Sequence, residues 1–122
     1  MANSSQERGI AAERMAAAYL ETQGLEIIAR NLRCHLGELD LVCRDGKVLV
    51  IVEVRARSRS DYGGALASVT RQKQRRLLRT TRYYWQRCIG WRAMALRFDV
   101  VALQGCADGG SAMTWVKDAF RA

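Results

Sequence analysis

The sequence lacks several features that would define its class at once. It has no proline and only ten glycines in 122 residues, which excludes collagen-like proteins and proline-rich linkers. Its longest strongly apolar stretch, Val48 to Val52, is far shorter than the ~20 residues that span a membrane. Charged residues interrupt the N-terminal alanines, so no apolar core of a secretory signal is present. We therefore expect a cytoplasmic protein that does not enter a membrane.

Spaced metal-binding or redox motifs are also absent. The four cysteines lie far apart and form no C-x-x-C pair, and the sole histidine, His35, adjoins Cys34 without a second pair downstream. The sequence therefore predicts reduced, mostly buried thiols rather than a zinc site. What remains is an ordinary globular composition, with 49% apolar and 26% charged residues. The length is that of one domain, so we expect a single domain over residues 1–122.

Positive charge is concentrated in one part of the chain. Residues 55–92 hold eleven basic residues and one acidic residue, whereas the whole chain has a net charge of +8. A basic segment of this density attracts polyanions, of which nucleic acid is the commonest in a cytoplasm. Codon bias explains the abundance of arginine as well as phosphate binding does, but it does not explain why the basic residues are clustered. Nucleic acid is therefore the expected partner.

A first helix is predicted from Ser4 or Ser5 to about Gln23, with Gly24 ending it. At 100° per residue, Glu13 falls at the centre of the apolar stripe of this helix. A buried carboxylate needs a partner, a proton or a metal ion. A structural salt bridge and a functional role are both open for Glu13.

A predicted hairpin brings further acidic residues together. Residues 25–30, 37–44 and 47–55 are expected strands, and the apolar run of the third predicts burial on both faces. If Asp45-Gly46 forms a two-residue loop, Arg44 pairs with Lys47 and paired residue numbers add up to 91, which places Glu38 opposite Glu53. Asp40 then lies opposite Ile51 and diagonal to Glu53, with Cβ atoms about 7 Å apart. Alternation predicts one face with Glu38, Asp40, Glu53 and Arg55, and another with Leu39, Leu41, Cys43 and the valines at 48, 50, 52 and 54.

Converging carboxylates need compensation, because like charges across a strand pair are destabilising. Asp40 and Glu53 at this separation can both reach one Mg²⁺ ion, which would leave positions for water and a phosphate. Neutralisation by Arg55, with or without Arg57, is the structural alternative. Spacing alone does not decide between them.

A loop is expected at Gly63-Gly64, followed by a second helix from Ser68 or Thr70 to about Gly90. Its apolar face is predicted to hold Leu77, Leu78, Thr81, Tyr84, Trp85 and Cys88. Lys73 and Gln74 are positioned to point back toward the sheet, while Arg71, Arg75, Arg79 and Arg82 form a stripe on the other side. This stripe is a phosphate-binding surface or simply a solvated face. Residues 96–103 and 112–116 are expected to form two further strands.

These residues resemble a known family. The resemblance rests on seven short segments in this order: Ala12-Glu13, Arg30-Asn31, Gly37 to Leu41, Val52 to Arg57, Gly63-Gly64, Lys73-Gln74 and Arg97 to Val101. In this order they resemble the YraN-like family of predicted bacterial endonucleases, within the restriction-endonuclease-like or PD-(D/E)XK superfamily, which is similar to archaeal Holliday junction resolvases. The resemblance covers almost the whole chain. It implies an α/β fold with a mixed central sheet flanked by helices.

The resemblance also implies a site. It assigns Asp40 and Glu53 as ligands of Mg²⁺ or Mn²⁺, with the backbone carbonyl of Val54 as a further ligand and Glu13 as a third carboxylate acting through water. The chain departs from the superfamily's E-x-K signature, because arginine stands at position 55. A buried lysine can lose its proton and act as a base, whereas arginine stays charged and can only orient water or stabilise a transition state. Lys73 is a candidate to take over part of that role.

Two functions follow as hypotheses. The first is a metal-dependent endonuclease for DNA, including branched or junction DNA, with Glu13, Asp40, Glu53 and Arg55 catalytic and Glu38 as a secondary candidate. In it the backbone is held by the basic and polar residues Arg57, Arg71, Lys73, Gln74, Arg75, Arg79 and Arg82. The second is a non-catalytic nucleic-acid-binding module that uses the same basic surface. A homodimer is a further expectation, since related resolvases act as dimers.

Overall fold

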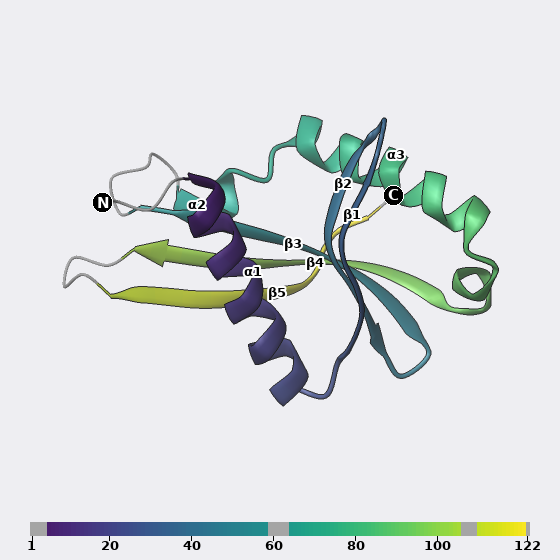
Figure 1. The fold of residues 1–122 in the computed structure, drawn as a ribbon, viewed down its shortest axis with the longest axis horizontal. Helices are drawn as coiled ribbons and strands as arrows, with labels where there is room; N and C mark the ends of the chain where they lie inside the picture. Colours follow the sequence, from purple (N-terminus) through teal and green to yellow (C-terminus); the bar gives the residue numbers. More distant parts are fainter. Residues whose placement is uncertain (1–4, 59–63, 106–109, 122) are drawn as a thin grey trace.

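The computed structural model describes residues 5–58, 64–105 and 110–121. In chain order the elements are α1 (Ser5–Thr22), β1 (Glu26–Cys34), β2 (Gly37–Asp45), β3 (Val48–Arg57), α2 (Gly64–Ala67), α3 (Arg71–Arg87), the 3₁₀ helix η1 (Ile89–Ala93), β4 (Ala95–Gly105) and β5 (Ser111–Phe120). The strands form one sheet in the order β1-β2-β3-β4-β5 (Figure 1). β3 and β4 are parallel and the other neighbours are antiparallel. This confirms the predicted mixed central sheet flanked by helices.

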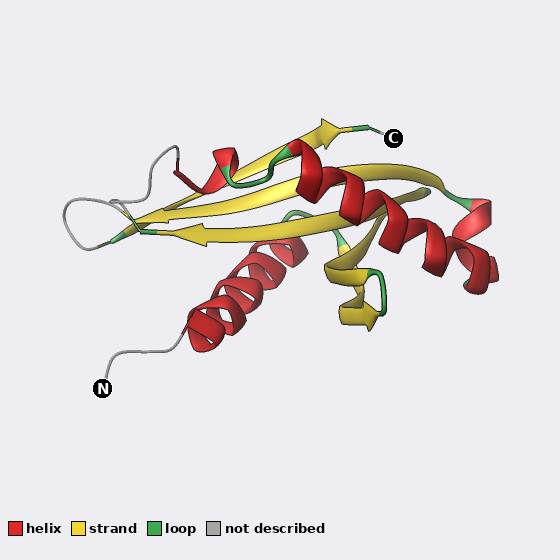
Figure 2. Cartoon of the chain, turned by 90° about the horizontal axis from the view of Figure 1, so that it is seen from above, coloured by secondary structure: helices red, strands yellow, loops and turns green. Residues whose placement is uncertain are grey.

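The sheet separates two apolar layers. α1 lies on one face and α3 on the other (Figure 2). Ala16 and Leu20 of α1 belong to a cluster with Val50 and Val52 of β3, whereas Leu77 of α3 belongs to a second cluster with other side chains of the same strand. Because β3 contributes to both, its apolar run is buried on both faces as predicted. Since β3 is the central strand and packs on both faces, the residues at its C-terminal end are held in a fixed position.

Local sequence signals set some element boundaries, and tertiary contacts move others. The side-chain oxygen of Thr70 caps α3 by accepting from the backbone nitrogen of Lys73 at 3.2 Å. α3 ends at Arg87, and η1 rather than a continuous helix carries the chain onward. The expected loop at Gly63-Gly64 is wrong in part, because a single helical turn, α2, begins at Gly64; Gly63, like Ser4, lies outside the described residues. β1 and β5 are longer than predicted because strand pairing continues beyond their apolar segments.

The predicted hairpin register is wrong by two residues. Asp45 pairs with Val48 and Leu41 with Val52, so the paired numbers add up to 93 and the loop is Gly46-Lys47. Gly46 has a φ of 61°, which suits a turn with glycine at its first central position. Asp45 stays in the ladder, and its carboxylate accepts from Arg97 at 3.3 Å. An even shift preserves the faces of the strands but changes the partners.

Continued by one step beyond Leu41 and Val52, the corrected register would place Asp40, and not Glu38, opposite Glu53. The pairing of β2 with β3 ends at Leu41, whereas β2 remains paired with β1 down to Gly37. β1 and β2 thus run steeply across the other strands (Figure 1). This bend explains why Leu39, predicted beside Leu41, packs in the cluster that contains Leu77 of α3 instead.

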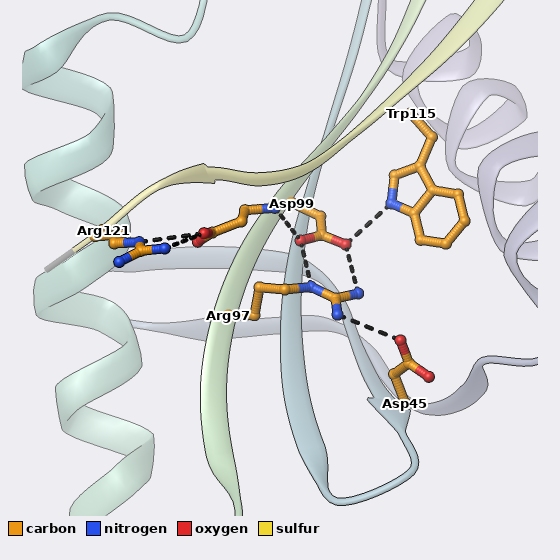
Figure 3. Close-up of polar contacts among 6 residues, drawn as sticks. Asp45, Arg97, Asp99, Trp115 and Arg121 are labelled. Carbon is orange, nitrogen blue, oxygen red and sulfur yellow. Dashed lines mark hydrogen bonds and ion pairs between the residues drawn. The ribbon is translucent and has the colours of Figure 1, made fainter.

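The buried carboxylate of Asp99 is fully hydrogen-bonded by groups of the protein itself. Asp99, which has no exposed surface, accepts from Arg97 Nε at 2.9 Å and Nη2 at 3.0 Å, and from Trp115 Nε1 at 2.9 Å (Figure 3). The backbone nitrogen of Asp118 donates a fourth hydrogen bond at 2.9 Å. These contacts join β4 to β5 where the register shifts between Phe98 and Val100. Asp99 therefore serves the fold.

Two sequence expectations concern the rest of the chain. Among the described cysteines, Cys43 is buried, Cys34 and Cys88 are half-buried, and all three are free thiols. Cys106 lies outside the described residues. Within the described segments, no helix is both long and apolar enough to cross a bilayer.

Candidate functional site

A cleft of about 1030 Å³ opens where β2 leaves β3. One wall comes from α1 and another from the hairpin of β1 and β2. The end of β3 and the first turn of α3 complete it. The polar and charged side chains that line it are Glu13, Asn31, Arg33, Glu38, Asp40, Glu53, Arg55, Arg57, Ser58 and Lys73. The cleft therefore contains every predicted carboxylate.

Glu53 is the most buried acid of this cleft, with 2% of its side chain exposed. Its Oε2 accepts from Arg55 Nη1 at 3.4 Å and lies 3.3 Å from Lys73 Nζ. Its Oε1 is buried and has no hydrogen-bond partner among the described residues. Burial, followed by the neighbouring charge of Asp40, raises the pKa of Glu53 to about 8. The free oxygen is thus a place for a proton or a cation.

Asp40 is held by the backbone of β3. Its Oδ2 accepts from the Val54 backbone nitrogen at 2.9 Å. The ladder between β2 and β3 has already ended at Leu41 and Val52, so this side chain replaces a backbone acceptor. The contact fixes Asp40 beside Glu53 on the same face of the sheet. The predicted convergence of these two carboxylates is therefore present, although just beyond the end of the β2–β3 ladder and not as a diagonal pair within it.

Glu13 reaches the cleft from α1. Partial burial, followed by the charges of Asp40 and Glu38, raises the pKa of Glu13 to about 7. The Asn31 amide faces the carboxylates of Glu13 and Glu38; in the orientation that satisfies both of its polar atoms, its nitrogen donates to both Glu13 oxygens, at 2.9 and 2.8 Å, and to Glu38 Oε1 at 3.1 Å. Glu38 also pairs with Arg33 at 3.3 Å. Among the described residues Glu13 has no ion pair, so its partner is the neutral Asn31 amide and not the expected salt bridge. A functional role for Glu13 stays a prediction.

Asn31 was not predicted as a site residue. It occupies the left-handed region of the backbone with a φ of 53°. Asparagine tolerates this conformation better than most residues, and the strain is held where its side chain bridges two carboxylates. The only sequence signal was its place in the Arg30-Asn31 pair. Its role depends on α1 packing against the hairpin, which local patterns do not show.

The cationic side of the cluster comes from two elements. Arg55 Nε donates to Ser68 Oγ at 2.9 Å, so a residue just before α3 orients the arginine that pairs with Glu53. Lys73 points to the sheet as predicted. Gln74 is half-buried and its amide donates to the Val69 carbonyl at 3.2 Å. Ser68 is a second site residue that the sequence did not indicate, since the local pattern predicts only a helix cap at Ser68 or Thr70.

The predicted arginine stripe is exposed along α3, but it does not line the cleft. It consists of Arg71, Arg75, Arg79 and Arg82. Arg57 lies closer, at the cleft wall, where its Nη1 donates to the Ala56 carbonyl at 2.8 Å. The carboxylates and the exposed arginines therefore form adjacent regions and not one mixed cluster.

Comparison with known proteins identifies the family. Residues 12–103 match the family described as uncharacterised protein family UPF0102. The chain belongs to this family. A UPF0102 protein of Halorhodospira halophila is 50% identical over 98% of this chain and 91% of its own length. Others from Pseudomonas putida KT2440 and Legionella pneumophila Philadelphia 1 are 47% and 40% identical over 92% and 97% of this chain, and over 90% and 98% of their own lengths.

UPF0102 membership agrees with the YraN-like resemblance, and the description of the family names no activity. The matched segment begins at Ala12 and ends at Leu103, so it contains the whole set of cleft carboxylates together with Lys73. β5 and most of the Asp99 network's partners lie beyond that segment or at its end. The cleft is thus part of the region that defines UPF0102 similarity.

The cleft offers a limited set of metal ligands. Within the described segments, no group of three or more His, Cys, Asp or Glu side chains could hold a metal ion by itself. An ion beside Asp40 and Glu53 would therefore depend on two carboxylates, a backbone carbonyl and oxygen atoms from water or phosphate. Mg²⁺ commonly binds through one or two carboxylates and keeps several waters. The buried free Oε1 of Glu53 fits such an ion.

Proposed function

We propose that this UPF0102 protein is a metal-dependent endonuclease of the restriction-endonuclease-like superfamily that hydrolyses phosphodiester bonds in DNA. Branched and junction DNA are the first substrates to test. The observation that carries the proposal is the buried Glu53 carboxylate, which lies beside Asp40 and leaves one oxygen without a partner among the described residues. Perturbed acids in a cleft are typical of catalytic sites.

Asp40, Glu53 and the backbone carbonyl of Val54 would hold Mg²⁺ or Mn²⁺. The bound ion would supply Lewis-acid activation of water and neutralise charge at the phosphate. Asp40 is suited to this task because its Oδ2 is fixed by the Val54 backbone nitrogen. Glu53 is suited because its other oxygen is already oriented by two cations.

Arg55 and Lys73 divide the role of the missing lysine of the E-x-K signature. Both approach Glu53 Oε2, Arg55 along the same strand and Lys73 from α3. Arg55 is held by Ser68 and keeps its charge, so it serves to stabilise the transition state. Lys73 is the residue that can orient the attacking water, with Glu13 as a further acid on the opposite wall.

DNA would lie across the basic surface next to the cleft. Arg57 at the cleft wall and the exposed arginines of α3 supply guanidinium groups for phosphate contacts. Lys73 and Gln74 lie at the start of α3, between this surface and the acids. Such contacts give affinity without sequence preference, as suits a substrate defined by its shape.

Cleavage assays test the proposal. Purified protein is incubated with four-way junction, single-stranded and duplex DNA in Mg²⁺ or Mn²⁺. We expect cleavage that is lost in Asp40→Ala and Glu53→Ala and kept in Glu21→Ala, an exposed acid of α1. Cleavage that survives both cleft substitutions would refute the assignment.

The clustering of arginine on α3 supports a second candidate, a non-catalytic nucleic-acid-binding module. That function predicts salt-dependent binding that is indifferent to metal and to the loss of Asp40. Absence of cleavage on every substrate, together with such binding, would favour it.

A further inference from the structure

A second recess lies at the other end of α3 from the carboxylates. Its volume is about 310 Å³. His35 and Leu36, from the turn between β1 and β2, form one side, and Arg79, Arg82, Tyr83 and Arg87 of α3 form the other. None of these residues lines the cleft that holds Glu53. The recess is therefore a separate feature of the same basic helix.

The hairpin turn is held firmly against α3. Tyr84 Oη donates to the Arg33 carbonyl at 2.7 Å. Gly37, with a φ of 152°, approaches so closely that an added Cβ would lie 2.8 Å from Thr80 Oγ1. These contacts fix the two sides of the recess relative to each other. The recess is thus built before any ligand arrives, which lowers the entropic cost of binding.

Aromatic and guanidinium groups pack against one another in the recess. The rings of His35 and Tyr83 lie 5.4 Å apart in an edge-to-face arrangement. The Arg87 guanidinium lies 3.6 Å from the centre of the Tyr83 ring. Tyr84 also packs edge-to-face with Tyr83 at 5.2 Å, so the accessible ring surface is mainly that of the exposed His35, next to the part of the half-buried Tyr83 ring that remains open. A nucleobase stacks on surfaces of this kind.

The charge of the recess selects an anion. Three of its lining residues are arginines and none is acidic. Arg79 and Arg82 are exposed, and within the part of the chain that the structure describes neither has an ion-pair partner. Guanidinium groups bind phosphate through paired hydrogen bonds. Phosphate beside a stacking surface is the chemistry of a nucleotide.

We propose that this recess binds one unpaired nucleotide of a DNA strand, with its phosphate on Arg79 and Arg82 and its base against His35 and Tyr83. A duplex would present phosphates to the arginines but would keep its bases away from the rings. The inference rests on the proposed function, because it assumes that the strand in the cleft continues along α3. Ten residues separate Lys73 from Tyr83, which is about 15 Å of helix.

This distance sets the spacing between the two sites. At about 3.4 Å per nucleotide in a stacked strand, the recess lies four or five nucleotides from the phosphate at Glu53. A substrate that is base-paired at the cleft and unpaired a few nucleotides away satisfies both sites. Frayed DNA ends and branch points combine paired and unpaired nucleotides in this way.

Binding without metal tests the inference separately from cleavage. Fluorescence anisotropy would compare a labelled single-stranded DNA, the same strand with abasic positions, and a duplex of equal length. We expect His35→Ala and Tyr83→Leu to weaken single-strand binding about 5- to 100-fold and to leave duplex binding unchanged. Arg79→Ala with Arg82→Ala should weaken binding of all three probes. Arg44→Ala, an exposed arginine at the far end of β2, is the matched control and should have little effect.

The outcomes distinguish stacking of a base from binding of phosphate alone. Equal losses on duplex and single-stranded DNA in His35→Ala would overturn the stacking assignment in favour of phosphate binding alone, and so would unchanged binding of the abasic strand. His35 is exposed, so its substitution serves if Tyr83→Leu fails to fold. Asp40→Asn should retain binding at the recess, because Asp40 does not line it. This variant therefore separates a failure of the nuclease proposal, which concerns cleavage, from a failure of the binding proposal.

Discussion

Replacement of Glu53 by glutamine should make the protein more stable in alkaline solution while abolishing cleavage. Burial and the neighbouring charge of Asp40 raise the pKa of Glu53 from 4.5 to about 8. In the unfolded chain this glutamate ionises near its ordinary value. Between these pH values the folded state holds a proton that the unfolded state has released, so stability falls as pH rises. Glutamine keeps the shape and removes the ionisation.

The expected magnitude follows from the shift. One pKa unit corresponds to about 1.4 kcal/mol, so the ionised Glu53 costs on the order of 4 kcal/mol of stability at pH 9 relative to pH 5. The difference between Glu53→Gln and the wild type should be small at pH 5 and grow to this order by pH 9. Saturating Mg²⁺ should restore stability to the wild type at high pH, because an ion that binds only the folded state stabilises it. The glutamine variant should gain little.

Urea unfolding from pH 5 to 9, with and without Mg²⁺, measures these differences. Glu21→Gln is the matched control, since Glu21 is an exposed acid of α1 that does not line the cleft. A difference between Glu53→Gln and wild type that stays constant over this pH range would refute the reasoning. Equal stabilisation of both proteins by Mg²⁺ would refute the metal assignment.

Three further predictions concern single groups. Lys73→Met should reduce the cleavage rate at least tenfold with little loss of DNA affinity, measured by single-turnover kinetics and anisotropy. Asp99→Ala should destabilise the fold by about 3–5 kcal/mol in urea unfolding, since it leaves Arg97 without its buried partner. Asn31→Asp should lower both stability and cleavage near pH 8, because it places another negative charge beside Glu13, whereas Asn31→Gly should retain the backbone conformation and lose only the amide contacts. A melting temperature for Asn31→Asp equal to that of the wild type would contradict this.

Much of the fold is encoded in local patterns. The apolar run at the centre of β3 predicted burial on both faces, and the capping residue Thr70 set the start of α3. The hairpin register was predicted incorrectly because two adjacent loop positions, Asp45-Gly46 and Gly46-Lys47, both place glycine in a turn. The choice between them depends on Asp45, whose partner Arg97 comes from a strand far along the chain. A pattern confined to the hairpin carries no information about that contact.

The site was predictable to a similar extent. Asp40 and Glu53 could be placed together because strand alternation in a hairpin fixes their face, whereas Lys73 was only a candidate, since its approach depends on how α3 packs against the sheet. The contribution of Asn31 could not be predicted, because it requires α1 and the hairpin to meet at one side chain. Ser68 escaped notice for the same reason, since its hydroxyl contacts Arg55 only after α2 and α3 have packed beside β3. Periodicity reports the face of an element, whereas these contacts arise between elements.

The two buried acids of the described chain make opposite use of the same sheet. Asp99 has four donors distributed over both oxygens, and every one of them comes from the protein. Glu53 has both of its cationic partners on one oxygen and none on the other, although it is nearly as buried. A fold that needed Glu53 only for stability would gain from satisfying that oxygen or from replacing the residue with an apolar one. The function we propose accounts for this incomplete satisfaction, because a cation that binds from outside would take the free oxygen of Glu53, with Asp40 as its second carboxylate ligand.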